Sequence, residues 1–138
     1  MNSKSRMAPL RGEKVLIVDD SRIMRDYLRQ MLLELGFNSF VEADSAVDTY
    51  KRYEIDKPDI VFLDIELNED DGLMVFERLL QNDPKANVAI ISAHSTIDNV
   101  KKAMGLGAKG FLVKPFNPKK LFITLKNMGC DFVPTSPK

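Results

Sequence analysis

Short apolar segments alternate with amphipathic segments through most of this chain, and that alternation limits the possible folds more than any other feature of the sequence. Four apolar segments, at residues 15–18, 59–63, 88–91 and 110–113, are rich in β-branched residues and predict strands. A weaker one lies at residues 39–42. The segments that start at Val15, Ile60 and Val88 are apolar at consecutive positions, as expected of strands that are covered on both faces.

The segments between the predicted strands have the apolar spacing of helices. We expect helices at about residues 23–35, 45–53, 72–81, from 96 onwards, and 118–128. Ser45, Asp71 and Asn117 occupy cap positions, and Gly36 is a stop signal for the first helix. The apolar faces comprise Ile23, Tyr27, Leu28, Met31, Leu32 and Leu35 in the first helix and Ile97, Val100 and Met104 in the fourth.

A strand followed by a helix, five times over, predicts an α/β fold: a doubly wound five-stranded parallel sheet with helices on both faces. The length of 138 residues fits one domain. We assign residues 1–12 to a flexible N-terminal arm, 13–129 to the folded domain and 130–138 to a C-terminal tail or linker stub. Sheets of this type bind ligands beyond the carboxyl ends of their strands, where the strand order reverses.

The composition excludes several classes of function. Twenty basic residues balance twenty acidic ones, so the chain lacks the overall positive field of a nucleic-acid-binding domain. No apolar run approaches the roughly 18 residues of a membrane span. The single cysteine, Cys130, cannot form an internal disulfide, which suits a reducing compartment. We therefore expect a cytoplasmic domain that binds neither membranes nor nucleic acid directly.

Polar residues of particular kinds follow four of the predicted strands. Asp19 and Asp20 follow the first, Asp64 ends the third, Ser92 the fourth and Lys114 the fifth. In a parallel sheet all of them reach the same edge. Clustered carboxylates repel one another unless a cation intervenes, and hard oxygen ligands suit Mg²⁺. A cation, an amine and a hydroxyl around one carboxylate are what phosphoryl transfer to that carboxylate requires.

Four strings carry a resemblance to a known family: VLIVDDS, FLDIELNEDDG, IISA and GFLVKPF, in this order and each at a strand end. Over roughly residues 14–128 the chain resembles the CheY-like receiver domains of response regulators in two-component signalling systems. The resemblance implies a flavodoxin-like sheet of order 2-1-3-4-5. It also implies a cis peptide bond between Lys114 and Pro115.

The resemblance assigns a role to each polar residue at the strand ends. It implies that Asp64 is the phosphoacceptor and that Mg²⁺ is held by Asp20 directly, by Asp19 through water, by Asp64 and by the backbone carbonyl of Glu66. Ser92 and Lys114 would contact the phosphoryl group after transfer. Phe111 stands where the family places an aromatic side chain that turns inward on activation, so Ser92 and Phe111 are the implied switch residues.

The implied function is signalling, not the turnover of a substrate: the domain catalyses only its own phosphorylation and dephosphorylation. A histidine kinase or phosphotransfer protein would supply the phosphoryl group. The face formed by the fourth helix, fifth strand and fifth helix would then control a downstream effector or an output domain missing from this chain. Dimerisation on phosphorylation is compatible with the sequence.

Three other functions are open to a fold of this kind. One is a phosphorylation-independent scaffold of receiver shape, against which the complete set of site residues argues. Another is a small Mg²⁺-dependent phosphatase with an aspartyl nucleophile, whose second acid Glu66 would imitate weakly. A flavin or nucleotide binder would need a loop rich in Gly, Ser or Thr after the first strand, where this chain has Asp19 and Asp20.

The chain departs from the family pattern after Asp64. Asn68 stands where the family often has proline, and Glu69, Asp70 and Asp71 add negative charge near the site. Glu66 occupies a position that tunes dephosphorylation in this family.

Overall fold

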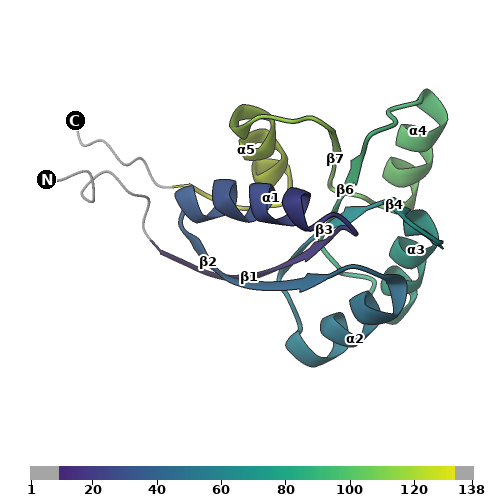
Figure 1. Cartoon of the computed structure of the whole chain (residues 1–138), viewed down its shortest axis with the longest axis horizontal. Helices are drawn as coiled ribbons and strands as arrows, with labels where there is room; N and C mark the ends of the chain where they lie inside the picture. Colours follow the sequence, from purple (N-terminus) through teal and green to yellow (C-terminus); the bar gives the residue numbers. More distant parts are fainter. Residues whose placement is uncertain (1–9, 133–138) are drawn as a thin grey trace, which may run out of the picture.

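A computed structural model, which describes residues 10–132, contains the predicted five-stranded parallel sheet with the order β2-β1-β3-β6-β7 (Figure 1). Counted along the chain within this sheet, the order is 2-1-3-4-5, so the predicted fold class is confirmed. A two-stranded hairpin, β4-β5, was not predicted. The strands are β1 (Arg11–Val18), β2 (Phe37–Ala43), β3 (Ile60–Asp64), β4 (Glu66–Leu67), β5 (Asp70–Asp71), β6 (Val88–Ser92) and β7 (Gly110–Val113).

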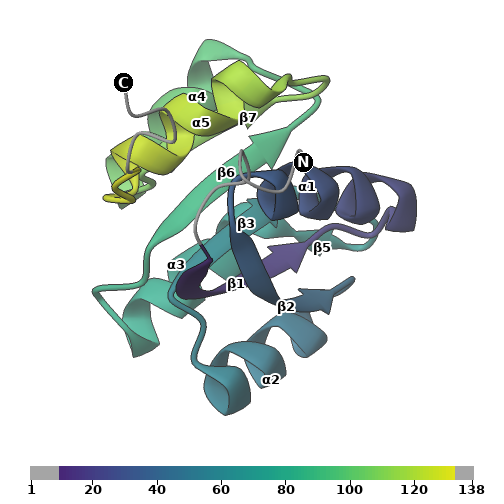
Figure 2. The ribbon, with the colours of Figure 1, turned by 90° about the vertical axis from the view of Figure 1, so that its left-hand side faces the viewer.

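Five helices connect the strands and cover both faces of the sheet (Figure 2). They are α1 (Arg22–Glu34), α2 (Ala46–Asp56), α3 (Gly72–Asn82), α4 (Ile97–Leu106) and α5 (Pro118–Asn127). Side chains of α1 and α5 pack on one face, against Val15, Ile17 and Phe62. Those of α3 and α4 pack on the other, against Leu16 and Val18. Consecutive strand residues are therefore all buried, which explains the unbroken apolar runs.

Polar side chains begin each helix as the sequence indicates. Ser45, Asp71 and Asn117 each accept a hydrogen bond from a backbone N–H of the first turn, which confirms the three predicted caps. Ser21 and Thr96 do the same for α1 and α4. These bonds satisfy N–H groups that have no partner within the helix, and they locate the helix starts.

The apolar faces predicted for α1 and α4 are only partly buried. Ile23 is 82% exposed, Ile97 is 74% exposed and Met104 is 45% exposed. The buried side chains of α1, which include Leu28, lie in its second half, and in α4 only Ala103 is buried. Helical spacing places these apolar residues on one side of a helix, but the extent of the sheet beneath decides which of them are covered.

The domain limits differ slightly from those expected. Strand β1 begins at Arg11, so the last two residues of the predicted arm belong to the sheet; residues 1–9 lie outside the described part. At the other end, Cys130 is buried and its N–H donates to the Leu125 carbonyl at 3.0 Å. Residues 133–138 of the predicted tail lie outside the described part of the chain. No helix within residues 10–132 is long and apolar enough to cross a membrane.

Gly72 begins α3 against the backbone at the end of β3. Its N–H donates to the Ile65 carbonyl at 3.0 Å, and a Cβ there would lie 2.5 Å from the Asp64 carbonyl oxygen and overlap the Ile65 Cα. The contact atoms are backbone atoms, which cannot rotate away. Only glycine lets α3 start this close to Asp64.

We expect Gly72→Ala to lower the free energy of unfolding by about 1–3 kcal/mol, because backbone must move to accept the methyl group. Gly105→Ala is the matched control, since nothing lies within 4 Å of a Cβ at that position within α4. Its effect should be neutral or stabilising by up to about 1 kcal/mol. Urea denaturation of both variants measures the difference, and equal effects would contradict the role assigned to Gly72.

Candidate functional site

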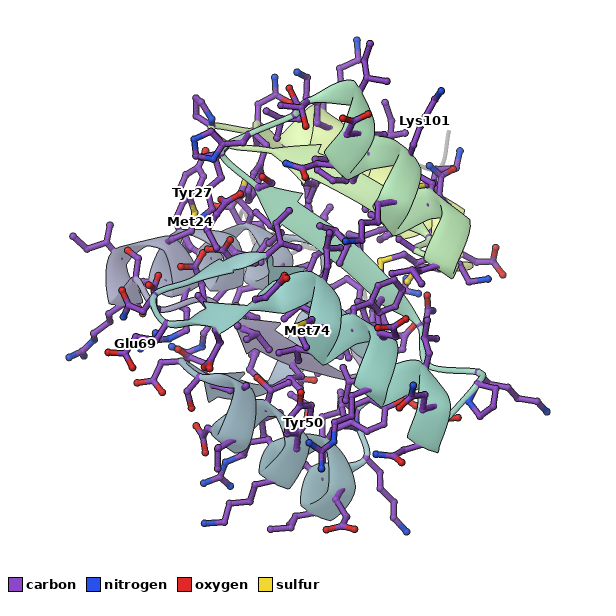
Figure 3. All side chains as sticks on the ribbon, turned by 90° about the vertical axis from the view of Figure 1, so that its right-hand side faces the viewer. Met24, Tyr27, Tyr50, Glu69, Met74 and Lys101 are labelled. Atoms are coloured by element: carbon purple, nitrogen blue, oxygen red, sulfur yellow. The ribbon has the colours of Figure 1, made fainter. Side chains whose placement is uncertain are left out.

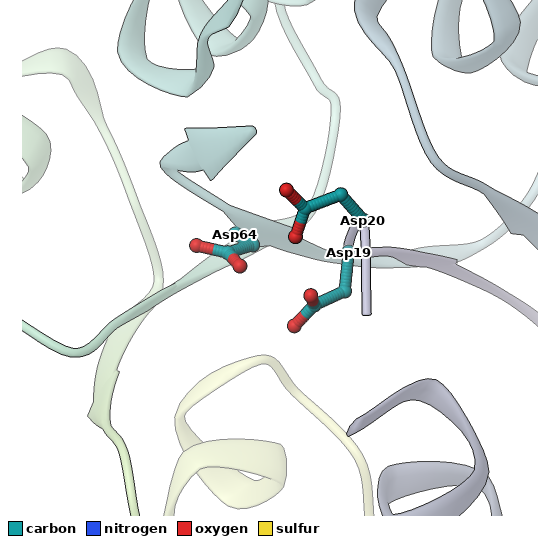
Figure 4. A group of neighbouring side chains, drawn as sticks. All are labelled: Asp19, Asp20 and Asp64. Carbon is teal, nitrogen blue, oxygen red and sulfur yellow. The ribbon is translucent and has the colours of Figure 1, made fainter. Parts of the chain in front are cut away.

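Two neighbouring strands bring the predicted acidic residues to one edge of the sheet. Asp19 and Asp20 follow β1, Asp64 ends the neighbouring strand β3, and oxygen atoms of all three carboxylates lie within 4.8 Å of one another (Figure 4). Asp19 and Asp64 are each 1% exposed, whereas Asp20 is half-buried at the mouth. The convergence expected from the strand ends is therefore present.

Lys114, just beyond β7, crosses to this cluster. Its Nζ lies 2.7 Å from Asp64 Oδ2, with which it forms a hydrogen bond, and 2.9 Å from Asp19 Oδ2. The Lys114–Pro115 peptide bond is cis, as the resemblance implies. One ammonium group thus neutralises part of the charge of two buried carboxylates that belong to different strands.

Backbone N–H groups hold the two buried carboxylates in place. Asp64 Oδ1 accepts the N–H of Glu66 at 2.8 Å, and Asp19 Oδ1 accepts the N–H of Ser21 at 2.9 Å. Each bond closes a turn of the type that Asp forms with the residue two positions later. The side chains are thereby oriented before any ligand arrives.

Burial and charge alter the proton affinities at the site. Burial raises the pKa of Asp64 to about 6; the charge of Asp19 adds to this, while hydrogen bonds from Lys114 and Glu66 oppose it. Burial by itself would lower the pKa of Lys114, but its contacts with Asp64 and Asp19 outweigh burial and raise it. At neutral pH the site therefore holds an ionised Lys114 and a carboxylate whose negative charge is only partly compensated.

The donor set fits a hard divalent cation. Asp19 Oδ2 is fully buried, and although it forms an ion pair with Lys114, no donor among the described residues is aligned to give it a hydrogen bond. Asp20 adds a carboxylate on the solvent side. Carboxylate oxygens with access to water are the ligands that Mg²⁺ prefers, so the residues present suit that ion.

The two predicted switch residues lie near the cluster but make other contacts. Ser92 ends β6 and is fully buried, and its Oγ donates to Glu66 Oε2 at 2.5 Å. Phe111, in β7, is half-buried and packs against the apolar cluster that lies under α3 and α4. Within the described residues, neither side chain is hydrogen-bonded to Asp64.

Sequence reasoning missed the hydrogen-bond partners of the Glu66 side chain and the hairpin that presents it. Glu66 and Leu67 pair with Asp71 and Asp70 across a two-residue turn, in which Asn68 has a φ of 45°. Asparagine tolerates this left-handed conformation better than most residues, so Asn68 was the available signal for the turn. From the sequence, Glu66 was expected to offer its backbone carbonyl to Mg²⁺ and to occupy a position that tunes dephosphorylation, and its carboxylate was only a weak match for the second acid of a phosphatase. The hydrogen bond from Ser92 to this carboxylate was not expected.

Comparison with known proteins finds similar sequences that match most of the chain. A sequence model described as "Response regulator receiver domain" matches residues 15–126. Chemotaxis protein CheY of Listeria monocytogenes is 37% identical over 82% of this chain and 95% of its own length. CheY of Thermotoga maritima is 34% identical over 85% of this chain and 98% of its own.

Solved structures agree with this match. The crystal structure of a CheX-CheY-BeF3-Mg²⁺ complex from Borrelia burgdorferi contains a chain that is 31% identical, with a TM-score of 0.80. The similarity covers 86% of this chain and 90% of that one.

The raised pKa of Asp64 predicts a pH-dependent effect of Asp64→Asn when divalent cations are removed with a chelator. Since folding favours the protonated carboxyl, this stabilisation is complete below the ordinary pKa of 3.8 and is lost as the pH rises through about 6. The stability of the wild type relative to the variant should therefore fall by about 1–3 kcal/mol between roughly pH 4 and pH 7.5.

Denaturant titrations at several pH values measure this relative stability. Asp98→Asn removes an exposed carboxyl on α4 and serves as the matched control for the loss of one charge. A relative stability that rises with pH would contradict the pKa assigned to Asp64.

Proposed function

This chain belongs to the response regulator receiver domain family, and we propose that Asp64 is the residue on which it accepts a phosphoryl group. The observation that carries the proposal is the buried carboxylate of Asp64, bonded to Lys114 and adjacent to Asp19 and Asp20. We further propose that phosphohistidine, on a histidine kinase or a phosphotransfer protein, is the donor. The family supports a signalling role and a cytoplasmic location, where such kinases present their phosphohistidine.

In the proposed reaction a carboxylate oxygen of Asp64 attacks the phosphorus in line with the phosphorus–nitrogen bond. The new phosphorus–oxygen bond gives an acyl phosphate, and the histidine nitrogen leaves with the electron pair of the broken bond. Lys114 keeps its proton and pairs with the charge on the phosphoryl oxygens, which its raised pKa favours. Hydrolysis of the acyl phosphate returns Asp64 to its resting form.

Magnesium would be held by Asp19, Asp20, Asp64 and the backbone carbonyl of Glu66. Neutralisation of negative charge on the phosphoryl oxygens is the chemistry that the ion supplies when bound. The buried, incompletely bonded Oδ2 of Asp19 and the exposed side of Asp20 support this assignment.

Ser92 and Phe111 would couple phosphorylation of Asp64 to a change at the surface of the domain. Ser92 ends β6 and its Oγ accepts the N–H of His94 at 2.8 Å, so a displacement of Ser92 toward the phosphoryl group would move the loop that leads into α4. Phe111, half-buried in β7, would turn inward. The face formed by α4, β7 and α5 would thereby change shape and select a partner.

We expect that partner to be a downstream protein or an output domain. The Borrelia burgdorferi structure, in which CheY is in complex with CheX in the presence of BeF3 and Mg²⁺, supports an interaction between proteins. A phosphatase reaction has less support, because the carboxylate of Glu66 is hydrogen-bonded to Ser92 and Ala93 instead of facing Asp64 as a second acid.

Acetyl phosphate tests the acceptor directly. Incubation with acetyl phosphate and Mg²⁺ should add one phosphoryl group to the wild-type chain, measured by intact mass, and the gain should be lost in Asp64→Asn because the nucleophile is gone. Asp98→Asn is the control and should be phosphorylated normally. If Asp64→Asn is phosphorylated at the wild-type rate, the proposal is wrong.

Binding of Mg²⁺ should stabilise the fold even without a phosphoryl donor. At a concentration about 100 times Kd, one bound ion raises the free energy of unfolding by about 2.7 kcal/mol, since it binds only the folded site. Asp20→Asn should remove most of this increment by removing a ligand, whereas Asp98→Asn should retain it. Denaturation with and without Mg²⁺ measures the increment, and an equal increment in Asp20→Asn would contradict the proposed ligand set.

A further inference from the structure

The carboxylate of Glu66 accepts hydrogen bonds from two donors that lie beside Asp64. Glu66 Oε2 accepts the Ser92 hydroxyl at 2.5 Å, and Glu66 Oε1 accepts the N–H of Ala93 at 3.0 Å. Each carboxylate oxygen is thus bonded to the segment that joins β6 to α4. The Nδ1 atom of His94, in the same segment, lies 3.4 Å from Oε2.

These contacts favour an anion at that place. A hydroxyl and an N–H both donate to the two oxygens of this carboxylate. Hydrogen bonds to a carboxylate are charge-assisted, the stronger kind of hydrogen bond.

A phosphoryl group on Asp64 would need the same donors. Asp64 pairs with Ile91 across β3 and β6, so Ser92 is the next residue along the strand that adjoins Asp64. Three terminal oxygens of a phosphoryl group require partners, and Lys114 serves one side of the carboxylate. The hydroxyl of Ser92 and the N–H of Ala93 are the donors that adjoin the other, and both are bonded to Glu66.

We propose that Glu66 is an internal competitor of the phosphoryl group: its carboxylate holds Ser92 and Ala93 in the resting chain and must release them when Asp64 is phosphorylated. The inference rests on the proposed function of Asp64. It makes Glu66 a positioning residue, which sets how readily the chain is phosphorylated and keeps the β6–α4 segment in its resting arrangement.

The surroundings of Glu66 allow the release. Its side chain is 36% exposed, so the carboxylate can move into water without being buried elsewhere. Once displaced, it is repelled by the phosphoryl dianion and cannot easily return. Phosphorylation and the bond between Glu66 and Ser92 therefore exclude each other.

Two substitutions of Glu66 distinguish competition for the donors of Ser92 and Ala93 from simple charge repulsion between the carboxylate and the phosphoryl group. Glu66→Gln removes the charge and leaves a weaker, neutral acceptor. Glu66→Asp keeps the charge but shortens the side chain by one methylene, which draws it away from Ser92 and Ala93. Glu69→Gln is the matched control, because Glu69 is exposed in the turn of the same hairpin (Figure 3).

We expect both Glu66 variants to be phosphorylated by acetyl phosphate with Mg²⁺ about three- to tenfold faster than the wild type, as the loss of a charge-assisted hydrogen bond implies. Glu69→Gln should keep the wild-type rate. Acceleration in Glu66→Gln alone would reduce the effect to charge repulsion and overturn the proposal. Equal or slower rates in both variants would overturn it as well.

Binding of beryllofluoride provides a readout that needs no phosphoryl transfer. Titration of the Mg²⁺-loaded chain, followed by NMR, should show tighter binding in Glu66→Gln and Glu66→Asp than in the wild type, by a similar factor. In the resting state the amide proton of Ala93 should exchange faster in both variants. An unchanged affinity and an unchanged exchange rate would overturn the proposal.

The same phosphorylation measurements distinguish the proposed function of Asp64 from the role of Glu66. If none of the chains, wild type included, gains a phosphoryl group on Asp64, the proposed function fails. If all of them gain it at the same rate, the proposed function stands and the role of Glu66 is wrong.

Discussion

The ion pairs that Lys114 makes with Asp64 and Asp19 are the interaction on which the site depends. They join three strands at a place where both carboxylates are 1% exposed. Two buried negative charges without a cation would repel each other and lose their hydration, at a cost of several kcal/mol. The ammonium group offsets only part of this, as the raised pKa of Asp64 shows. The site is thus held in a state that a further cation, or a group that carries one, would stabilise.

The rest of the fold supplies the conditions for that interaction. Strands covered on both faces have rigid, buried ends, and the parallel register places those ends at one edge. Gly72 lets α3 begin directly against the backbone of Asp64 and Ile65. Along the chain, the hairpin β4-β5 lies between Ile65 and Gly72. Helix caps end the connecting loops within a few residues of the strands. The apolar core therefore fixes the positions of the polar groups at the strand ends, although these groups form little of the core themselves.

Strand ends were predictable because the physical signals are local. Asp19, Asp64 and Lys114 each follow an apolar run, and the alternation of strands and helices implies that such ends meet. The exposure of Ile23 and Ile97 was not predictable in the same way. Helical spacing shows which residues share a face, but coverage depends on how far the sheet and the neighbouring helices extend beneath that face.

The sequence by itself determined the alternation of strands and helices, the acidic cluster and its lysine. These features follow from the apolar periodicity and from the residues beside the strand ends. Tertiary structure alone decided the partners of Glu66. Its carboxylate meets Ser92 and Ala93, which are 26 and 27 positions away along the chain. That meeting depends on the turn at Asn68, on the adjacency of β3 and β6, and on one side-chain rotamer. No local pattern records such a choice, since it results from the competition of nearby donors for an anion.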